Sequence, residues 1–257
     1  MANLKFTGPE IQGLARNLYD LPLDKELSEK IFESTEGWII GIRFLLKELA
    51  ANKALQIPII SSHRGQQNLV NFLKEEILLG QQSSSSLQKL AIQAALFDRF
   101  NLELILKINR KEAEELGVET ENIGQDFFQF IEQSLFIIPL DEDKTWFRFH
   151  HLIQETLQGL VVKHYSKQQV RLFYRIGSGY FELRGFLREA INYARKGDDL
   201  DNAVEIIERN RYYYQDRDQA VELKALLDIL PSGAIEKSAS LLLARAFVLE
   251  ALSQFEQ

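Results

Sequence analysis

The sequence predicts a mainly α-helical protein in three parts: a helical subdomain, a winged-helix domain with one β-hairpin, and a series of antiparallel helix hairpins. Three observations lead to this fold class. Apolar residues recur at helical spacing along most of the chain. One pair of adjacent apolar runs, residues 135–140 and 146–149, flanks an acidic turn, which is the pattern of a β-hairpin. After residue 160, glycine and proline breaks separate amphipathic segments of similar length.

The overall composition excludes several classes of protein. Of the 257 residues, 46% are hydrophobic and 26% are charged, which is typical of a globular chain. The net charge of −7 argues against a surface that grips a nucleic-acid backbone unaided. The absence of cysteine excludes a disulfide scaffold, a thiol nucleophile and a thiolate metal site. No apolar run approaches the ~20 residues of a membrane span, and the first residues lack a signal-peptide core. We therefore expect no membrane contact and a cytoplasmic location.

The first part, residues 1–55, is expected to form the helical subdomain. Thr7 and Glu10 have the spacing of a capping box, and Pro9 is tolerated in the first turn of a helix. Apolar spacing predicts helices over residues 10–19, 24–34 and 38–51. Three short helices with short connections favour a compact bundle.

The second part, residues 56–162, has the element order of a winged helix. Residues 54–66 have the mixed polarity of a linker. Helices are predicted over residues 67–79, 87–97, 102–108 and 126–133, with a charged loop over residues 109–124 and the hairpin after them. Many winged helices bind DNA, but that function requires a basic recognition helix. Residues 87–97 carry only Lys89 in their interior, so DNA binding by this domain is disfavoured.

The third part, residues 163–257, predicts the start of a TPR-like array of helix hairpins. Helices are expected over residues 167–184, 187–195, 200–209, 218–230 and 238–253, with breaks near Gly185, Gly197 and Pro231. This spacing corresponds to repeats of roughly 34–40 residues. Because solenoids end in polar capping repeats and none follows the last predicted helix, we expect the array to continue in a longer protein.

Three motifs, in this order along the chain, resemble those of one family of regulators. Residues 35–45 read Thr-Glu-Gly-Trp-Ile-Ile-Gly-Ile-Arg-Phe-Leu, and residues 135–141 read Leu-Phe-Ile-Ile-Pro-Leu-Asp. Residues 147–157 read Phe-Arg-Phe-His-His-Leu-Ile-Gln-Glu-Thr-Leu. These stretches resemble a helix, a strand and a strand–helix junction of MalT-type regulators, and the resemblance extends over about residues 4–252. The family consists of large ATP-binding transcription regulators of the STAND class of signal-transduction ATPases.

The resemblance implies a domain order: a nucleotide-binding domain, a helical domain, a winged helix, a helical-repeat sensor and usually a C-terminal LuxR-type helix-turn-helix. The chain would be the central regulatory fragment. It contains no G-x-x-x-x-G-K-[ST] phosphate loop, so we expect no enzyme activity and no cofactor bound by this chain alone. ATP or ADP would belong to the parent protein. The implied partners are the N-terminal NTPase domain, a small-molecule or protein inducer at the repeats, DNA through a C-terminal domain, and further copies in an activated oligomer.

The resemblance also implies a nucleotide-binding role for four residues. In STAND proteins a histidine at the strand–helix junction contacts the β-phosphate of ADP, and His150 falls on that position. Gly37, Trp38 and Ile39 fall on the segment that closes over the adenine, although the family has a proline where this chain has Ile39. The alternatives are a histidine hydrogen-bonded at a hairpin edge and a tryptophan that anchors the core. Consecutive strand residues point to opposite faces, so His150 and His151 make a poor chelate, and we expect no metal site.

Two functions of different classes follow. In the leading hypothesis the winged helix holds the nucleotide-bound resting state of a transcription regulator, and the repeats sense an inducer. The alternative is a stand-alone helical-repeat adaptor that binds a protein partner without any dependence on nucleotide. An in-frame phosphate loop upstream of Met1 would favour the regulator, whereas stop codons on both sides of the chain would favour the adaptor.

Overall fold

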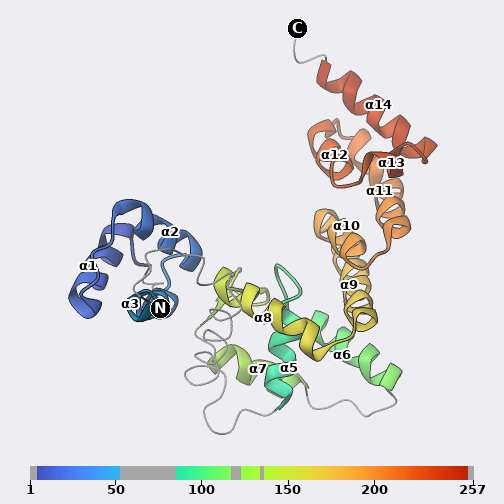
Figure 1. The fold of residues 1–257 in the computed structure, drawn as a ribbon. Helices are drawn as coiled ribbons and strands as arrows, with labels where there is room; N and C mark the ends of the chain where they lie inside the picture. Colours follow the sequence, from blue (N-terminus) through green and yellow to red (C-terminus); the bar gives the residue numbers. More distant parts are fainter. Residues whose placement is uncertain (1–4, 53–84, 117–122, 134–135, 254–257) are drawn as a thin grey trace. The chain divides into compact units, whose positions relative to one another are not determined.

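The fold is taken from a computed structural model that describes residues 5–52, 85–116, 123–133 and 136–253 (Figure 1). The chain divides into two compact units: Met1–Leu106 with Glu119–His164, and Lys107–Val118 with Tyr165–Gln257. The predicted fold class, mainly helical with one β-hairpin, is confirmed. The boundary predicted at residue 55, the linker over residues 54–66 and the helix over residues 67–79 lie outside the described residues. None of the described helices is long and apolar enough to cross a membrane.

The helical subdomain contains three mutually contacting helices, α1 (Gly8–Tyr19), α2 (Lys25–Thr35) and α3 (Ile39–Asn52). The predicted capping box is present, because the Thr7 backbone N–H donates to the Glu10 carboxylate at 2.8 Å. Asp24 caps α2 by accepting from the Leu27 N–H at 2.7 Å. The apolar faces meet in a small core that includes Ile11, Ala15, Ile31, Ile42 and Leu46.

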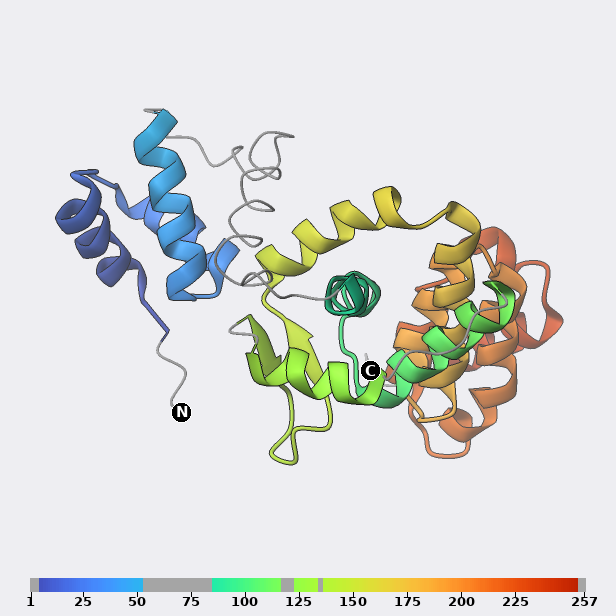
Figure 2. The same cartoon turned by 90° about the horizontal axis from the view of Figure 1, so that it is seen from below.

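The described residues of the winged-helix part form four helices and a two-stranded sheet. They are α5 (Ser85–Ala94), α6 (Leu102–Leu116), α7 (Ile123–Gln133), β1 (Ile137–Pro139), β2 (Phe147–Phe149) and α8 (His151–His164). The strands pair antiparallel with Ile138 opposite Arg148. Asp141 closes the turn, because its carboxylate accepts from the backbone N–H groups of Thr145 at 2.7 Å and Trp146 at 3.1 Å. Figure 2 shows α5 end-on between α7 and α8, both of which it contacts.

Phenylalanine rings fill the space between the hairpin and these helices. The ring of Phe149 lies 5.0 Å from that of Phe100 and 6.0 Å from that of Phe136, measured between centroids. Phe100 also exchanges two backbone hydrogen bonds with Phe147, of 2.8 and 2.9 Å, a β-bridge that the sequence did not indicate. Side chains alternate along a strand, so Arg148 points away from the face that buries Phe147 and Phe149.

Helix α6 is longer than predicted, because residues 109–116 continue the helix in place of the first half of the expected loop. Asn109 and Glu112 are 3% and 5% exposed and extend the buried stripe formed by Leu104, Ile105 and Ile108. The stripe keeps helical spacing but changes from apolar to polar residues at 109. A prediction based on hydrophobic periodicity therefore ended the helix too early.

After the end of α6, the second unit continues from Tyr165 as a run of helix hairpins. Its helices are α9 (Lys167–Glu182), α10 (Leu187–Lys196), α11 (Leu200–Gln215), α12 (Ala220–Leu227), α13 (Ser232–Ile235) and α14 (Ala239–Ser253). Contacts join α9 to α10, α10 to α11, α11 to α12 and α12 to α14 (Figure 1). The short helix α13 occupies the predicted break after Pro231, because proline is well suited to the position before a first helical turn.

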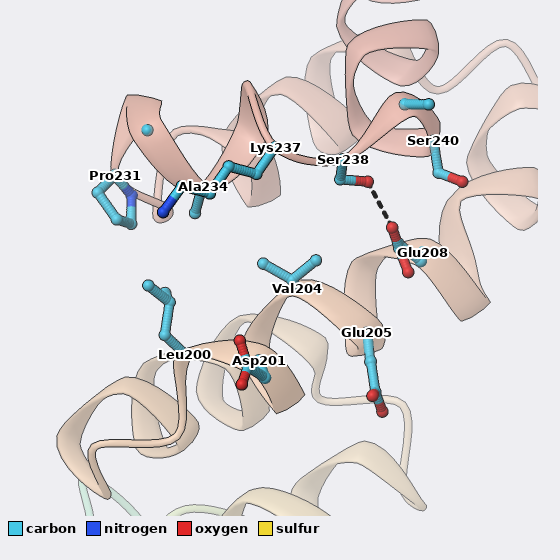
Figure 3. Close-up of a pocket in the computed structure, with 12 residues that line it drawn as sticks. Leu200, Asp201, Val204, Glu205, Glu208, Pro231, Ala234, Lys237, Ser238 and Ser240 are labelled. Atoms are coloured by element: carbon cyan, nitrogen blue, oxygen red, sulfur yellow. Dashed lines mark hydrogen bonds between the residues drawn. The ribbon is translucent and has the colours of Figure 1, made fainter.

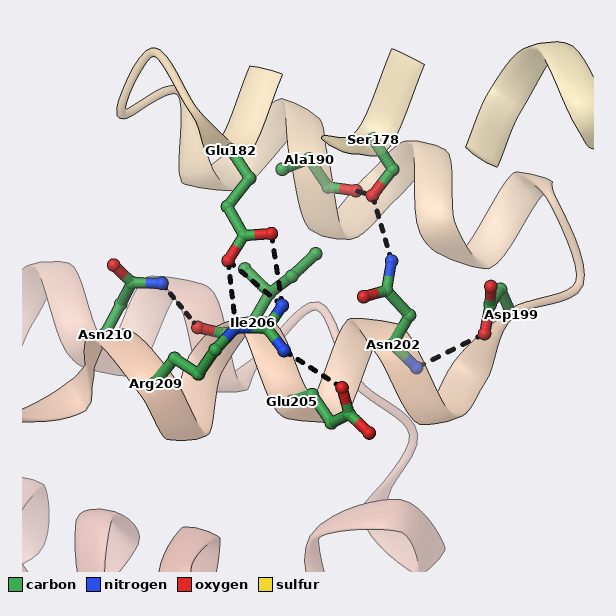
Figure 4. Close-up of polar contacts among 9 residues, drawn as sticks. All are labelled: Ser178, Glu182, Ala190, Asp199, Asn202, Glu205, Ile206, Arg209 and Asn210. Atoms are coloured by element: carbon green, nitrogen blue, oxygen red, sulfur yellow. Dashed lines mark hydrogen bonds and ion pairs between the residues drawn. The ribbon is translucent and has the colours of Figure 1, made fainter. Parts of the chain in front are cut away.

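Polar contacts tie α9, α10 and α11 together beside their apolar core (Figure 4). The buried Ser178 hydroxyl donates to the Ala190 carbonyl at 2.8 Å, and the Asn202 amide donates to the Ser178 oxygen at 3.4 Å. Arg209 binds the Glu182 carboxylate at 3.1 Å and the Glu205 carboxylate at 2.9 Å. These contacts join α9 to α10 and to α11, so they link helices that are close in the chain, as is usual in a repeat array.

Candidate functional site

A cluster of polar and aromatic groups forms where the end of α2 meets the end of β2. Arg148 donates two hydrogen bonds to Glu36: Nη1 to Oε1 at 2.9 Å and Nη2 to Oε2 at 2.6 Å. The side chains are 30% and 24% exposed, so the ion pair is half-buried. This two-pronged geometry fixes both groups in distance and in direction. It joins residues 112 positions apart, one in the helical subdomain and one in the winged helix.

The alternation of β2 explains why the side chains of Arg148 and His150 lie together. Phe147 and Phe149 face the aromatic core, so Arg148 and His150 share the opposite side. The His150 backbone N–H still donates to the Phe136 carbonyl at 3.0 Å, which extends the hairpin by one residue. The His150 carbonyl accepts from the Ile153 and Gln154 N–H groups at 3.0 Å and so begins α8.

The turn after α2 has an unusual backbone that presents the Glu36 carboxylate. Glu36 and Gly37 both lie in the left-handed region, with φ of 53° and 75°. A Cβ on Gly37 would lie 2.7 Å from the Phe6 carbonyl oxygen, so a larger residue is excluded here on two grounds. The Phe6 N–H donates to the Gly37 carbonyl at 2.9 Å. The close approach that Gly37 permits in this structure is therefore that of the segment before α1.

Trp38 and His150 stack face to face, with ring centroids 5.0 Å apart and planes 13° apart. The indole also lies close to Gly41 in the first turns of α3. A Cβ on Gly41 would lie 2.8 Å from the Trp38 atom Cε3 and 3.2 Å from the Thr35 atom Cγ2. Thr35 itself is buried, and its hydroxyl donates to the Ile31 carbonyl at 2.7 Å. Thr35 and Gly41 thus flank the Trp38 ring, which stacks on His150.

His150 is 6% exposed, and its Nδ1 atom is buried without a hydrogen-bond partner. The Glu36 atom Oε2 lies 3.7 Å from Nδ1, beyond hydrogen-bonding range. Burial lowers the pKa of His150 to about 4, and the charges of Arg148 and Lys5 act in the same direction, whereas Glu36 raises it. The hydrogen bonds from Arg148 hold the pKa of Glu36 below its usual value. At neutral pH the site therefore holds a neutral imidazole beside an ion pair.

Three of the four predicted site residues come together here. His150 stacks on Trp38, and Gly37 forms the turn that leads into Trp38. Ile39 is the first residue of α3 and is half-buried. His151, in contrast, is exposed, and its Nε2 lies 3.6 Å from the Glu155 carboxylate. Whether any of these residues binds a nucleotide stays a prediction.

Sequence reasoning missed Glu36 and Arg148. Both lie inside the motifs of the family resemblance and carry opposite charges: Glu36 is next to Gly37, and Arg148 is two residues before His150. Pairing across 112 positions has no local sequence signal, so only the structure reveals the partners. Among the described residues, no group of three or more metal-ligating side chains is close enough to hold a metal ion.

A second candidate site lies in the repeats, where α11 faces α13 and the start of α14 (Figure 3). The pocket has a volume of about 660 Å³. Its walls are apolar at Leu200, Val204 and Ala234 and charged at Asp201 and Lys237. Glu208, also in the wall, accepts a hydrogen bond from the Ser238 hydroxyl, which joins α11 to the start of α14.

The comparison with protein families decides the nature of the middle segment. Residues 74–169 match the family model described as the MalT winged helix domain. The chain contains a MalT-type winged helix. Arg148, His150 and the aromatic core lie inside the matched segment, and the predicted resemblance to MalT-type regulators is confirmed.

The similarity to MalT proteins extends beyond the winged helix. The chain is 24% identical over 239 residues to the HTH-type transcriptional regulator MalT of Vibrio campbellii, covering 91% of this chain and 25% of that protein. It is 22% identical over 265 residues to MalT of Yersinia pestis, covering 100% of this chain and 27% of that protein. The serine/threonine-protein kinase PknK of Mycobacterium tuberculosis is 24% identical over 249 residues, covering 96% of this chain and 21% of that protein. The chain thus spans about a quarter of the length of these relatives and is similar to a regulator fragment.

Proposed function

We propose that this chain is the central signal-relay segment of a STAND-type, ATP-dependent transcription regulator in the cytoplasm. In this proposal the winged helix holds the nucleotide-bound resting state through His150. The helical repeats receive an inducer, and the nucleotide belongs to an N-terminal NTPase domain of the parent protein. DNA would be read by a C-terminal LuxR-type domain, and the activated form would assemble into an oligomer.

The observation that carries the proposal is the buried, unpartnered Nδ1 atom of His150. Native proteins rarely leave a buried polar group without a hydrogen bond, because its desolvation costs about 1–3 kcal/mol. Here the atom lies 3.7 Å from the nearest carboxylate oxygen of Glu36. A partner outside this chain that offers an oxygen to Nδ1 would remove that cost.

The residues present fit a phosphate group. The pKa of about 4 keeps His150 neutral at physiological pH, and one nitrogen of a neutral imidazole carries a proton that it can donate. The carboxylate of Glu36 would repel a phosphate, but Arg148 neutralises it through two hydrogen bonds. Bound nucleotide would supply the switching chemistry, whereas this chain would orient and hold the imidazole.

The pocket between α11, α13 and α14 supports the proposed sensing role of the repeats. It lies in the second unit and combines apolar walls with the charged groups of Asp201 and Lys237. Such a mixed lining is typical of sites for small polar molecules. We infer that an inducer of this class binds the repeats there.

The proposal predicts that His150→Ala, in the intact regulator that carries this segment, raises transcription in the absence of inducer. Loss of the contact that favours the resting state shifts the population towards the active state. A reporter gene measures this directly, and His151→Ala is the matched control because that neighbour is exposed. Basal transcription that is equal in wild type and His150→Ala would overturn the resting-state role.

A further inference from the structure

One carboxylate stands between two possible partners at the candidate site. Both oxygens of Glu36 accept hydrogen bonds from Arg148, at 2.9 and 2.6 Å. Oε2, which makes the shorter bond, is also the atom that lies 3.7 Å from His150 Nδ1. A displacement of about 1 Å would bring that oxygen within hydrogen-bonding distance of the imidazole.

The charges around His150 come from three elements. Glu36, at the end of α2, favours the protonated imidazole, whereas Arg148 on β2 and Lys5 before α1 disfavour it. Burial adds the largest effect in the same direction as the two cations. On the element that follows His150, His151 and Glu155 are exposed and pair with each other. Among the described residues, Glu36 is therefore the anion that favours a positive charge on His150.

Arg148 has the advantage over His150 in the competition for Glu36. A guanidinium is always charged and matches both oxygens of a carboxylate at once. His150 can form a charged pair with Glu36 only after it takes up a proton in a buried position. As long as Arg148 holds Glu36, that carboxylate is not available to pair with a protonated imidazole, and Nδ1 stays unpaired.

We propose that Glu36 and Arg148 are positioning residues that keep the Nδ1 atom of His150 free. When the contact between Arg148 and Glu36 breaks, the Glu36 carboxylate pairs with His150 instead. The site then has two arrangements. In one arrangement, His150 is neutral and can donate a hydrogen bond to an oxyanion. In the other, a His150–Glu36 ion pair occupies Nδ1 and withdraws it. The inference rests on the proposed function for its purpose, but the exchange itself involves only residues of this chain.

The stack of Trp38 on His150 provides the readout. The chain has two tryptophans, so a Trp146→Phe background leaves Trp38 as the sole fluorophore of its kind. A protonated imidazole quenches an indole stacked on it, whereas a neutral one does so weakly. Fluorescence against pH in this background therefore reports the protonation of His150 without any nucleotide.

The background protein should begin to lose fluorescence only as pH approaches the His150 pKa of about 4. Arg148→Gln should move the midpoint to higher pH, because Glu36 is freed to pair with His150. A midpoint one pH unit higher would raise the protonated fraction at pH 5.5 from about 3% to about 24%, a change of roughly eightfold. Adding Glu36→Gln to Arg148→Gln should return the midpoint to low pH.

Control variants separate this exchange from general effects of charge and folding. Arg43→Gln removes one positive charge from the exposed face of α3 and should leave the midpoint unchanged. Arg148→Lys keeps the charge but not the two-pronged contact, so its midpoint should lie between those of the background and Arg148→Gln. If Arg148→Gln fails to fold, the midpoint of Arg148→Lys tests the proposal in its place.

Two results would overturn the proposal. The first is a folded Arg148→Gln protein whose midpoint stays near that of the background. The second is the loss of pH-dependent quenching in that variant. That loss would mean that Arg148 serves only to hold the helical subdomain against the winged helix. Neither result bears on nucleotide binding, so a failure here is distinguishable from a failure of the proposed function.

Discussion

At the scale of single residues, the motif from Thr35 to Gly41 can be explained position by position. Glu36 binds Arg148, Gly37 takes a backbone conformation with φ of 75°, and Trp38 stacks on His150. Gly41 leaves room for the indole, because a Cβ there would lie 2.8 Å from Trp38. The family resemblance predicted a site of Gly37, Trp38, Ile39 and His150, but it could not show that a buried stack joins Trp38 and His150.

Gly41→Ala is predicted to destabilise the protein by about 1–3 kcal/mol, because the new methyl group overpacks the contact with Trp38 and Thr35. Gly13→Ala is the matched control. Gly13 lies inside α1 and is exposed, and a Cβ there meets nothing within 4 Å. The control should be neutral or stabilising by up to about 1 kcal/mol, since alanine favours the helix. Urea unfolding of both variants tests the pair, and equal effects would contradict the packing role of Gly41.

His150 should make the stability of the protein sensitive to mild acid. Its pKa is lowered from 6.5 to about 4 in the folded state, so the unfolded chain takes up the proton first as pH falls. The free energy of unfolding should be unaffected by this group above pH 6.5, decrease between pH 6.5 and 4, and stop changing below pH 4. The full difference is about 3 kcal/mol.

The comparison with His150→Phe isolates this effect, because phenylalanine keeps a flat ring against Trp38 but does not titrate. The difference in unfolding free energy between wild type and variant, measured by urea unfolding at pH 7 and pH 5, should shrink or reverse at the lower pH. A difference that is the same at both values would show that His150 is not the buried neutral group described here.

At the scale of elements, the sequence predicted helices and strands whose buried residues are apolar. It missed segments that bury polar residues. The hairpin and α8 follow the predicted order because Phe147 and Phe149 alternate with polar residues. Helix α6 was cut short because Asn109 and Glu112 continue its buried stripe. The bridge between Phe100 and Phe147 was missed because one paired residue leaves no periodic signal.

The joint between α5 and α8 depends on side-chain amides. The Gln158 amide donates to the Ala95 carbonyl at 2.8 Å, and the Gln154 amide donates to the Phe97 carbonyl at 3.1 Å. These carbonyls follow the end of α5, where helical hydrogen bonds run out. Gln158→Met keeps the length of the side chain but removes the donor, so it should cost about 1 kcal/mol. Gln168→Met, on the exposed face of α9, should change the thermal unfolding midpoint little, and an equal shift in both would count against the joint.

At the scale of the whole molecule, the chain combines a MalT-type winged helix with helix hairpins in two compact units. Its similarity to the MalT proteins of Vibrio campbellii and Yersinia pestis extends over about a quarter of the length of each of those proteins. Composition could predict what the chain is not, for example a disulfide-stabilised scaffold, since cysteine is absent. The pairing of distant residues such as Glu36 and Arg148 lay beyond sequence reasoning, because it depends on how separately folded segments meet.

The most direct test of the central claim is the rate at which ADP leaves the intact regulator that carries this segment. If the Nδ1 atom of His150 binds a phosphate in the resting state, His150→Gln should release ADP at least about tenfold faster than wild type, a loss of roughly 1.4 kcal/mol. His151→Gln should release it at the wild-type rate. Equal release rates from wild type and His150→Gln would contradict the account.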